Sequence, residues 1–148
     1  MTVRYLLDTN VVSEPLKKKP NPSIITALER YESEIAISAT VWHELNYGAL
    51  RLQPGRNRDR YLCYFEEVLR KKLPIVPYND IAAFIHAQER ARLVSLGRTP
   101  SFADGQIAAT AIANDTVLVT SNVPHFRVFD GLAIEDWKDR PGRRRRRK

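Results

Sequence analysis

Three acidic residues stand where short apolar segments of the chain give way to polar sequence. Asp8 ends the run "VRYLLD" (3–8), Glu44 follows "EIAIS" (34–38) by about one helical turn, and Asp104 lies in the otherwise small and apolar segment "SFADGQIAATAIA". Carboxylates gathered in one cleft raise one another's pKa, and a divalent cation removes that cost. Hard cations such as Mg²⁺ or Mn²⁺ prefer carboxylate and water ligands and commonly meet phosphates. The three acids are therefore candidate metal ligands.

Each acid also has an ordinary structural interpretation. The stretch 8–10, "DTN", is a good helix-capping sequence. Glu44 could be a solvated or capping charge, and Asp104 could complement the dipole of a helix whose first turn it occupies. Gly105, next to Asp104, gives an open backbone that suits a metal ligand or a phosphate-facing site. Taken singly, none of the three residues decides between structure and function.

Histidine and cysteine offer no alternative metal site. His43, His86 and His125 are isolated from one another and from Cys63, so no zinc-ligand spacing is present. The single cysteine cannot form an internal disulfide, which favours a reducing compartment. It lies among apolar helix positions in "RYLCYFEEVLR", and we expect it to fill the core.

Short apolar segments that alternate with helical patterns would position the acids. Five segments are predicted strands: 3–8, 34–38, 73–77, 116–121 and 132–136. Several are continuous apolar runs, as expected for parallel strands that are covered on both faces. Amphipathic or buried helices are predicted between them, including one over 58–72 and one that begins near Asn79 or Asp80 and ends at Gly97. The pattern predicts an α/β fold with a central parallel sheet, whose ligands bind at the carboxyl ends of the strands.

Size and charge describe one ordinary globular domain with a basic end. The chain has 148 residues, of which 43% are hydrophobic and 28% charged, and its formal charge is +7. The last six residues, "RRRRRK", carry +6 of that charge, so the remainder is +1. We expect a single domain over residues 1–140 and a basic, disordered tail over 141–148. The sequence shows neither a secretory signal nor a membrane-length apolar stretch, so we expect a cytoplasmic protein.

Four stretches together resemble the PIN-domain family. They are "LLDTNVVSE", "SATVWHELNYG", "FADGQIAATAIANDTVLVTSNVPHF" and "LAIEDW", and the likeness runs from about Val3 to Trp137. The sequence is most similar to the VapC-like ribonuclease toxins of type II toxin–antitoxin pairs. No single motif is decisive, but the order and spacing of the four within one small domain are specific.

The resemblance implies a fold, an activity and partners. It implies a PIN-like three-layer fold with a central parallel sheet of about five strands flanked by helices. It also implies a Mg²⁺- or Mn²⁺-dependent endoribonuclease whose metal-binding and catalytic acids are Asp8, Glu44 and Asp104, with Thr9 and Asn10 flanking the first. The partners that it implies are an RNA substrate, a second copy of the chain and a cognate antitoxin, which would form a toxin–antitoxin hetero-oligomer; it implies no membrane.

The sequence departs from the family pattern in "VTSNVPHF". Many members carry a fourth acid in the turn after this strand, where this chain has Asn122. An amide brings no charge, so a stably occupied second metal site is less favoured, whereas activity with one ion is not excluded. Thr120 and Ser121 offer hydroxyls nearby, and capping of the strand end is their plain alternative.

Other functions remain open from the sequence. A non-catalytic RNA-binding or scaffold module with a PIN-like fold is the main alternative, and Asn122 favours it. A haloacid-type phosphotransferase would need an aspartate two residues after Asp8, where this chain has Asn10. No residue is assigned to RNA binding, although the basic stretches 17–19 and 51–60 are candidates. The apolar band of the 58–72 segment is expected to be mostly core, with a part left as a groove for an antitoxin helix.

Overall fold

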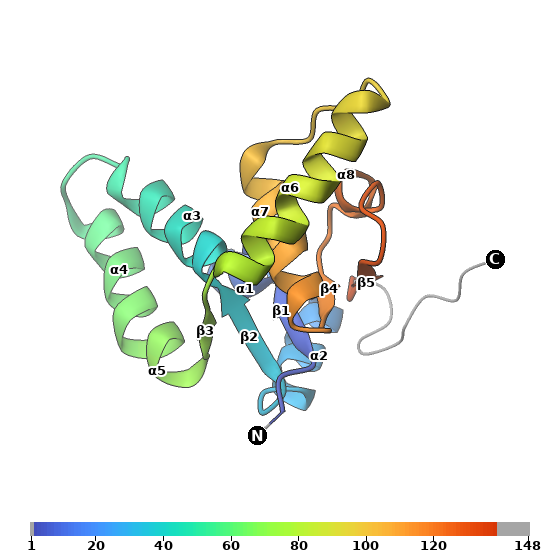
Figure 1. Cartoon of the computed structure of the whole chain (residues 1–148). Coiled ribbons are helices and arrows are strands. Elements are labelled where there is room, and N and C mark those ends of the chain that lie inside the picture. Colours follow the sequence, from blue (N-terminus) through green and yellow to red (C-terminus); the bar gives the residue numbers. More distant parts are fainter. Residues whose placement is uncertain (1, 139–148) are drawn as a thin grey trace.

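The computed structural model, which describes residues 2–138, has a five-stranded parallel sheet at its centre (Figure 1). The strands are β1 (Tyr5–Leu7), β2 (Ile35–Ser38), β3 (Ile75–Val76), β4 (Val117–Val119) and β5 (Ala133–Glu135), in the spatial order β3-β2-β1-β4-β5. All five predicted strands are confirmed. Each is shorter than its apolar segment because the flanking residues already turn into caps, helices and loops.

Helices connect all the strands. They are α1 (Thr9–Val12), the 3₁₀-helix η1 (Glu14–Leu16), α2 (Pro22–Arg30), α3 (Ala39–Leu50), α4 (Arg56–Tyr64), the π-helical segment η2 (Phe65–Leu69), α5 (Arg70–Lys72), α6 (Asp80–Ser95), α7 (Phe102–Ala113) and α8 (Val123–Phe126). The α4, η2 and α5 segments follow one another without a break and form one long helix, 56–72. Asn79 caps α6 through its side chain, and Gly97 has a φ of +76°, which explains why that helix ends there.

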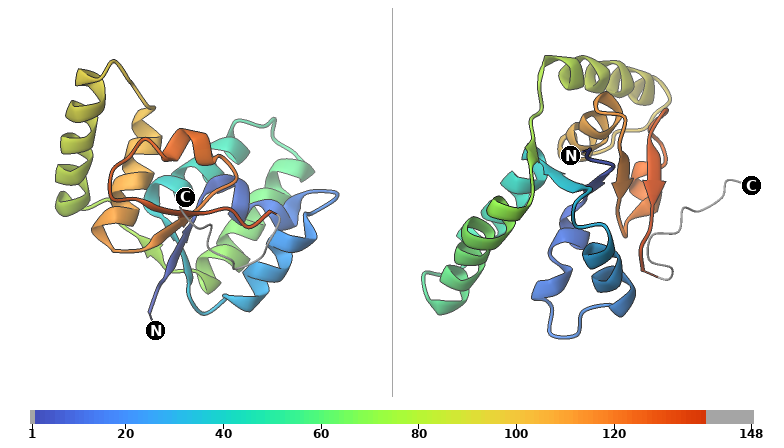
Figure 2. Two further views of the ribbon diagram at one scale, coloured as in Figure 1. Left: turned by 90° about the vertical axis from the view of Figure 1, so that its right-hand side faces the viewer. Right: turned by 90° about the horizontal axis from the view of Figure 1, so that it is seen from below.

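The helices cover both faces of the sheet, as the three-layer prediction requires. Helix α7 packs against β2 and β4 with α6 outside it, whereas α2 and the 56–72 helix lie on the opposite face (Figure 2). The strand order reverses between β1 and β4, because the chain moves outward from β1 to β3 and then returns to the other side of β1. The carboxyl end of β1 beside β4 is therefore the switch point at which ligands bind in such sheets.

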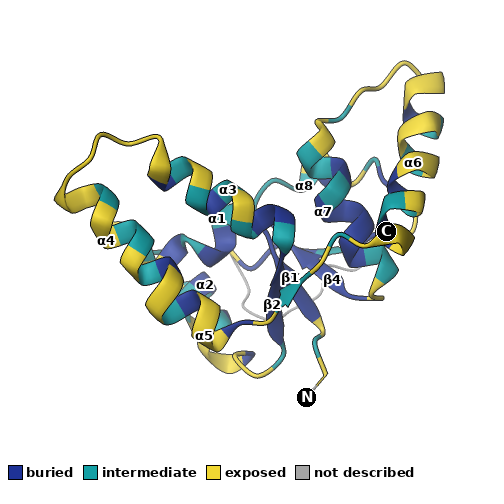
Figure 3. Ribbon diagram, turned by 60° about the vertical axis from the view of Figure 1, so that its left-hand side comes forward, coloured by how far each residue is buried: buried dark blue, intermediate teal, exposed yellow. Residues whose placement is uncertain are grey.

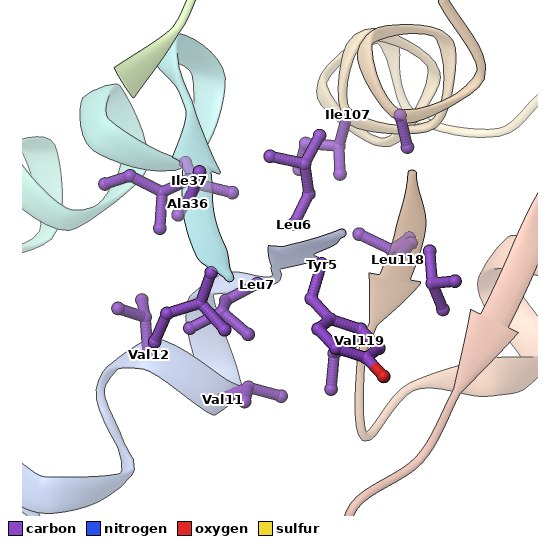
Figure 4. Close-up of a cluster of buried hydrophobic side chains, with 14 of the residues drawn as sticks. Tyr5, Leu6, Leu7, Val11, Val12, Ala36, Ile37, Ile107, Leu118 and Val119 are labelled. Atoms are coloured by element: carbon purple, nitrogen blue, oxygen red, sulfur yellow. The ribbon is translucent and has the colours of Figure 1, made fainter. Parts of the chain in front are cut away.

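Strand β1 shows why a continuous apolar run was predictive. Leu6 points toward Ile107 of α7, whereas Tyr5 and Leu7 point to the other side of the sheet, toward the face that carries α1 (Figure 4). All three strand residues are at most 2% exposed. A strand buried on both faces has no polar side to present, so its residues do not alternate.

An aromatic cluster secures the start of β1 to the end of the described chain. The rings of Tyr5, Tyr31 and Trp137 lie 5.0–5.5 Å apart, centroid to centroid. Trp137 is fully buried, and its indole nitrogen donates to Glu135 at 3.0 Å. The closing motif "LAIEDW" thus belongs to the core, and aromatic pairs of this kind add to the free energy of apolar burial.

The prediction for Cys63 is wrong. Its side chain is exposed, because its neighbours at i+3 and i+4 are Glu66 and Glu67 on the outer side of the 56–72 helix (Figure 3). The band on the inner side is divided: Phe65 and Leu69 are buried and the remaining apolar residues are only half-buried. The expectation that most of this band belongs to the core is wrong, because more of its apolar residues are half-buried than buried, whereas the expectation that a part stays open agrees with the structure.

The basic tail predicted for 141–148 lies outside the described residues, as do residues 139 and 140 of the predicted domain. Within residues 2–138, no helix has both the length and the apolar character that a membrane span requires.

Candidate active site

Asp8 lies at the switch point of the sheet, directly after β1. Its backbone nitrogen continues the strand by donating to Val119 at 2.9 Å, and its side-chain Oδ1 caps α1 by accepting from the nitrogen of Thr9 at 2.8 Å. The residue is 7% exposed. Capping and a functional role were alternatives in the sequence, but capping uses only part of the carboxylate. Each oxygen has two lone pairs, so acceptor capacity remains for another ligand.

Thr120, at the end of β4, holds the other oxygen of Asp8. Its hydroxyl donates to Asp8 Oδ2 at 2.8 Å and accepts from the backbone nitrogen of Asn122 at 2.9 Å. The side chain is fully buried. Thr120 therefore both caps the strand end and orients the acid. Asn10 also reaches this region, because its side-chain carbonyl accepts from the nitrogen of Ser121 at 3.2 Å.

Glu44 is linked to the same edge of the sheet through Thr9. Helix α3 begins at the end of β2, where Ser38 caps it by accepting from the nitrogen of Val41, and Glu44 lies on its second turn. The hydroxyl of Thr9 donates to Glu44 Oε1 at 3.0 Å. The segments that follow β1 and β2 are thus joined by a side-chain hydrogen bond between residues that are 35 positions apart in the sequence.

Asp104 approaches from α7, the helix on the α6 side of the sheet. Its backbone nitrogen donates to the Ser101 hydroxyl, which caps the helix, so the carboxylate is left for other partners. Its Oδ2 lies 4.0 Å from His125 Nδ1, and the same ring nitrogen is 2.8 Å from the side-chain nitrogen of Asn122. Asn122, which replaces the fourth acid of the family pattern, therefore lies near Asp104, with His125 beside both residues.

Burial and mutual repulsion raise the pKa values of two of these acids. Burial is the main cause of the raised pKa of Asp8; the hydrogen bonds from Thr120 and Thr9 oppose it, and the charge of Asp104 adds to it. Burial also raises the pKa of Glu44, and the charges of Asp8 and Asp104 act in the same direction. The structure thus brings the three acids within electrostatic reach of one another.

The donor chemistry of this acid cluster, defined as Asp8, Glu44 and Asp104, fits a hard divalent cation. All its ligand atoms are carboxylate oxygens, and a bound cation would remove the repulsion that raises their pKa values. In the described part of the chain, no three His, Cys, Asp or Glu side chains are arranged closely enough to hold a metal ion as they stand. Water or phosphate oxygens would have to supply the remaining ligands of an ion held by these carboxylates, and Mg²⁺ commonly keeps such ligands.

Gly105 has a different role from the one that the sequence suggested. A Cβ at this position would collide with the imidazole of His86, which packs onto the α7 backbone from α6. His86 is buried, and its Nδ1 lies 2.8 Å from the hydroxyl of Tyr78. The open backbone is filled by another helix and does not face a phosphate. This close approach of α6 and α7 determines where the first turn of α7, with Asp104, sits.

Sequence reasoning did not identify His125 as a neighbour of the acid cluster. The one available signal was its position in "SNVPHF", three residues after Asn122 and thus one helical turn away. His43 is exposed and stacks on Tyr47, with ring centroids 6.0 Å apart.

Comparison with known proteins identifies the family. The family model described as "PIN domain" matches residues 5–131. The chain belongs to the PIN domain family. The match spans all the elements that carry Asp8, Glu44 and Asp104, so the whole acid cluster lies inside the family's domain.

Two relatives are similar to this chain over nearly their full lengths. Toxin FitB of Neisseria gonorrhoeae is 32% identical over 90% of this chain and 99% of its own. The tRNA(fMet)-specific endonuclease VapC of Shigella flexneri is 32% identical over 91% of this chain and 98% of its own. Among solved structures, DNA-bound VapBC from Salmonella typhimurium has a TM-score of 0.81 at 31% identity, covering 91% and 98% of the two chains. The PIN fold predicted from the sequence is confirmed.

Proposed function

We propose that this PIN domain is a metal-dependent endoribonuclease that cleaves RNA phosphodiester bonds and acts in the cytoplasm as the toxin of a toxin–antitoxin pair. The observation that carries the proposal is the position of Asp8: a buried carboxylate, oriented by Thr120 at the switch point and repelled by Glu44 and Asp104. The names of the relatives, a toxin and a tRNA endonuclease, supply the substrate class and the biological role.

The chain's own residues would prepare this reaction. Asp8, Asp104 and Glu44 would hold Mg²⁺ or Mn²⁺, which when bound neutralises phosphate charge and lowers the pKa of a water nucleophile. Thr120 and Thr9 keep the carboxylates of Asp8 and Glu44 in fixed orientations, because each donates a hydroxyl hydrogen bond to one oxygen. A carboxylate of the acid cluster accepts the proton of the attacking water. The water oxygen attacks phosphorus in line with the leaving ribose oxygen, so that a new P–O bond forms as the old one breaks, and the leaving oxygen takes a proton from solvent water.

Asn122 favours one ion over two. Its amide nitrogen contacts His125, so the side chain is already engaged in the described structure. It adds no negative charge beside Asp104, and a second cation would lack a neutralising ligand there. A single-ion site is consistent with this arrangement.

An antitoxin and a second copy of the chain are the proposed protein partners. An open apolar hollow of about 510 Å³ lies between α2 and the 56–72 helix and is lined mainly by aliphatic side chains with Tyr64; we call it the apolar hollow. Its size and apolar lining suit the apolar face of an antitoxin segment. On α6, Ile81 and Phe84 are 59% and 65% exposed on one helical face, which suits contact with a second copy.

The deciding experiment measures cleavage of a structured RNA with Mn²⁺, with Mg²⁺ and with EDTA. We expect cleavage only with a cation, and loss of cleavage in Asp104→Asn at equal protein concentration. Equal cleavage by the wild type and Asp104→Asn would overturn the assignment of the acid cluster. RNA binding without cleavage under any metal condition would favour the non-catalytic module.

A further inference from the structure

An open hollow adjoins the acid cluster on the α1–α3 side and joins the two basic stretches of the sequence. Its volume is about 700 Å³. Thr9 and Glu44 are part of its lining, and much of the remaining lining is apolar, including Leu16, Leu45, Ala49, Leu52 and Phe65. Its cations are Lys17, Lys18 and Arg60, which line it together with Asn57 and Tyr61. We call it the basic hollow. Lys18 and Arg60 are 42 positions apart in the sequence, yet they face the same space.

A buried carboxylate positions the lysines of this hollow. Glu14 is 3% exposed; its Oε1 accepts from Lys17 Nζ and its Oε2 accepts from the backbone nitrogen of Asn21, each at 2.9 Å. These bonds close the loop between η1 and α2, so residues 17–19 have a defined course. Since Glu14 neutralises Lys17, Lys18 is the lysine of this wall whose charge is left for a ligand.

Arg60, on the opposite wall, combines a charge with an aromatic surface. Its guanidinium lies 4.8 Å from the centroid of the Tyr61 ring, and Tyr61 stacks on the buried Phe65 at 6.3 Å. No ion pair to Arg60 or to Lys18 is found among residues 2–138. The two cations lack an acidic partner within that range and can contact the phosphates of a nucleic acid, and the Tyr61 ring beside them can stack on a base.

We propose that the basic hollow is a substrate subsite that holds the single-stranded RNA next to the scissile phosphate. Lys18 and Arg60 contact phosphate oxygens, and Tyr61 supports a base. Thr9 and Glu44 border both this hollow and the acid cluster, so a strand can pass from one to the other without leaving the surface. The proposal rests on the proposed function, because it names how the substrate of the same site is held.

A binding experiment with a matched control tests the subsite. The probe is a fluorescent single-stranded RNA of ten nucleotides, measured by anisotropy in EDTA over a series of KCl concentrations with the full chain. Lys18→Ala/Arg60→Ala removes the two cations of the hollow, and Lys19→Ala/Arg56→Ala removes two exposed cations from the same segments that do not line it. Circular dichroism confirms that both variants fold.

We expect the hollow variant to bind RNA roughly tenfold more weakly at low salt and its log–log salt slope to fall by about 1.4, since each single-strand phosphate contact contributes about 0.7. We expect the control variant to change affinity by less than about twofold. Equal losses in both variants, or no loss in either, would overturn the subsite. An unchanged RNA affinity with weakened antitoxin binding would also overturn it and assign the hollow to the antitoxin.

Cleavage separates this proposal from the proposed function. For RNAs extended stepwise on either side of one cleavage site, we expect kcat/KM of the wild type and the control variant to rise with length, and this gain to disappear in Lys18→Ala/Arg60→Ala. A gain retained by the hollow variant overturns the subsite while leaving the nuclease intact. A wild type that binds RNA through the hollow but cleaves none overturns the nuclease, and with it the role of the hollow as a substrate subsite, and leaves the hollow as an RNA-binding site only.

Discussion

The hydroxyl of Thr120 donates to Asp8 Oδ2 at 2.8 Å although the two residues are 112 positions apart. Neighbouring strands β1 and β4 place them side by side, and Thr120 is fully buried. The bond partly offsets the effect of burial on the pKa of Asp8. Thr120 therefore positions the acid that carries the proposed function, and it does not itself touch the substrate.

Replacing Thr120 by valine keeps its shape and removes its hydroxyl. We expect Thr120→Val to raise the pKa of Asp8 further, because the charged carboxylate loses a hydrogen bond while its burial remains. The acidic limb of the pH profile for RNA cleavage should move to higher pH, and the free energy of unfolding at pH 7 should fall by about 1–3 kcal/mol. Thr120→Ser, which retains the hydroxyl, should keep the wild-type limb. An acidic limb at the same pH in Thr120→Val and Thr120→Ser would contradict the positioning role.

The raised pKa of Asp8 makes a prediction about stability without metal. A carboxyl whose pKa is raised by folding contributes stability below its unfolded pKa of about 3.9 and loses it as pH rises through the folded value. We expect Asp8→Asn, measured by urea unfolding in EDTA, to be more stable than the wild type at pH 7 and to have a smaller advantage at pH 4. The control, Asp115→Asn, changes an exposed turn residue with a φ of 52°, a conformation that asparagine tolerates. An advantage of Asp8→Asn that did not change with pH would contradict the prediction.

Metal binding should depend on Asp8 and be limited by Asn122. We expect calorimetric titration with Mn²⁺ to give a single ion for each wild-type chain and no detectable binding to Asp8→Ala. Asn122→Asp should bind a second ion or bind the first more tightly, since it restores a negative charge beside Asp104. Thermal unfolding of the same samples provides an independent measure, because a ligand that binds the folded state raises the melting temperature. Wild-type binding that survives in Asp8→Ala would place the ion elsewhere.

The contact between Gly105 and His86 predicts a specific double-variant result. A Cβ at residue 105 would collide with the imidazole, so we expect Gly105→Ala to lower the free energy of unfolding by about 1–3 kcal/mol. His86→Ala removes the ring and leaves the Tyr78 hydroxyl without this partner, so it should be destabilising alone. Added to His86→Ala, the alanine at 105 should cost much less than in the wild type. Additive losses in urea unfolding would argue against the close packing of α6 on α7.

The sequence was most informative where local pattern and topology agree. Continuous apolar runs predicted all five strands. Because a parallel sheet places the residues that follow its strands at one edge, the sequence predicted that Asp8 and Glu44 lie close together. In the structure, Thr9, which follows Asp8, donates a hydrogen bond to Glu44. Caps such as Asn79 were also local enough to predict. The role of the three acids as metal ligands remains a proposal, but their proximity follows from the fold.

The contacts that sequence did not predict are those between helices. Gly105 suggested an open backbone, yet nothing in its neighbourhood indicates that His86, 19 positions earlier, fills it. Cys63 was assigned to the core because its neighbours are apolar, and the side of the helix it faces depends on where the 56–72 helix packs. That Lys18 and Arg60 line the same hollow likewise depends on the loop that Glu14 closes.

The 56–72 helix stands between the two hollows and contributes Tyr61 and Phe65 to the basic one and Tyr64 and Val68 to the apolar one. Its middle turn is π-helical, a local widening that often marks functional positions in helices. A protein that shifts this common wall when it binds on the apolar side would alter RNA affinity on the basic side without blocking it. Thermodynamic reciprocity then requires RNA to weaken that protein's binding by the same factor. Inhibition of this kind would be relieved by excess substrate even though the two ligands never compete for an atom.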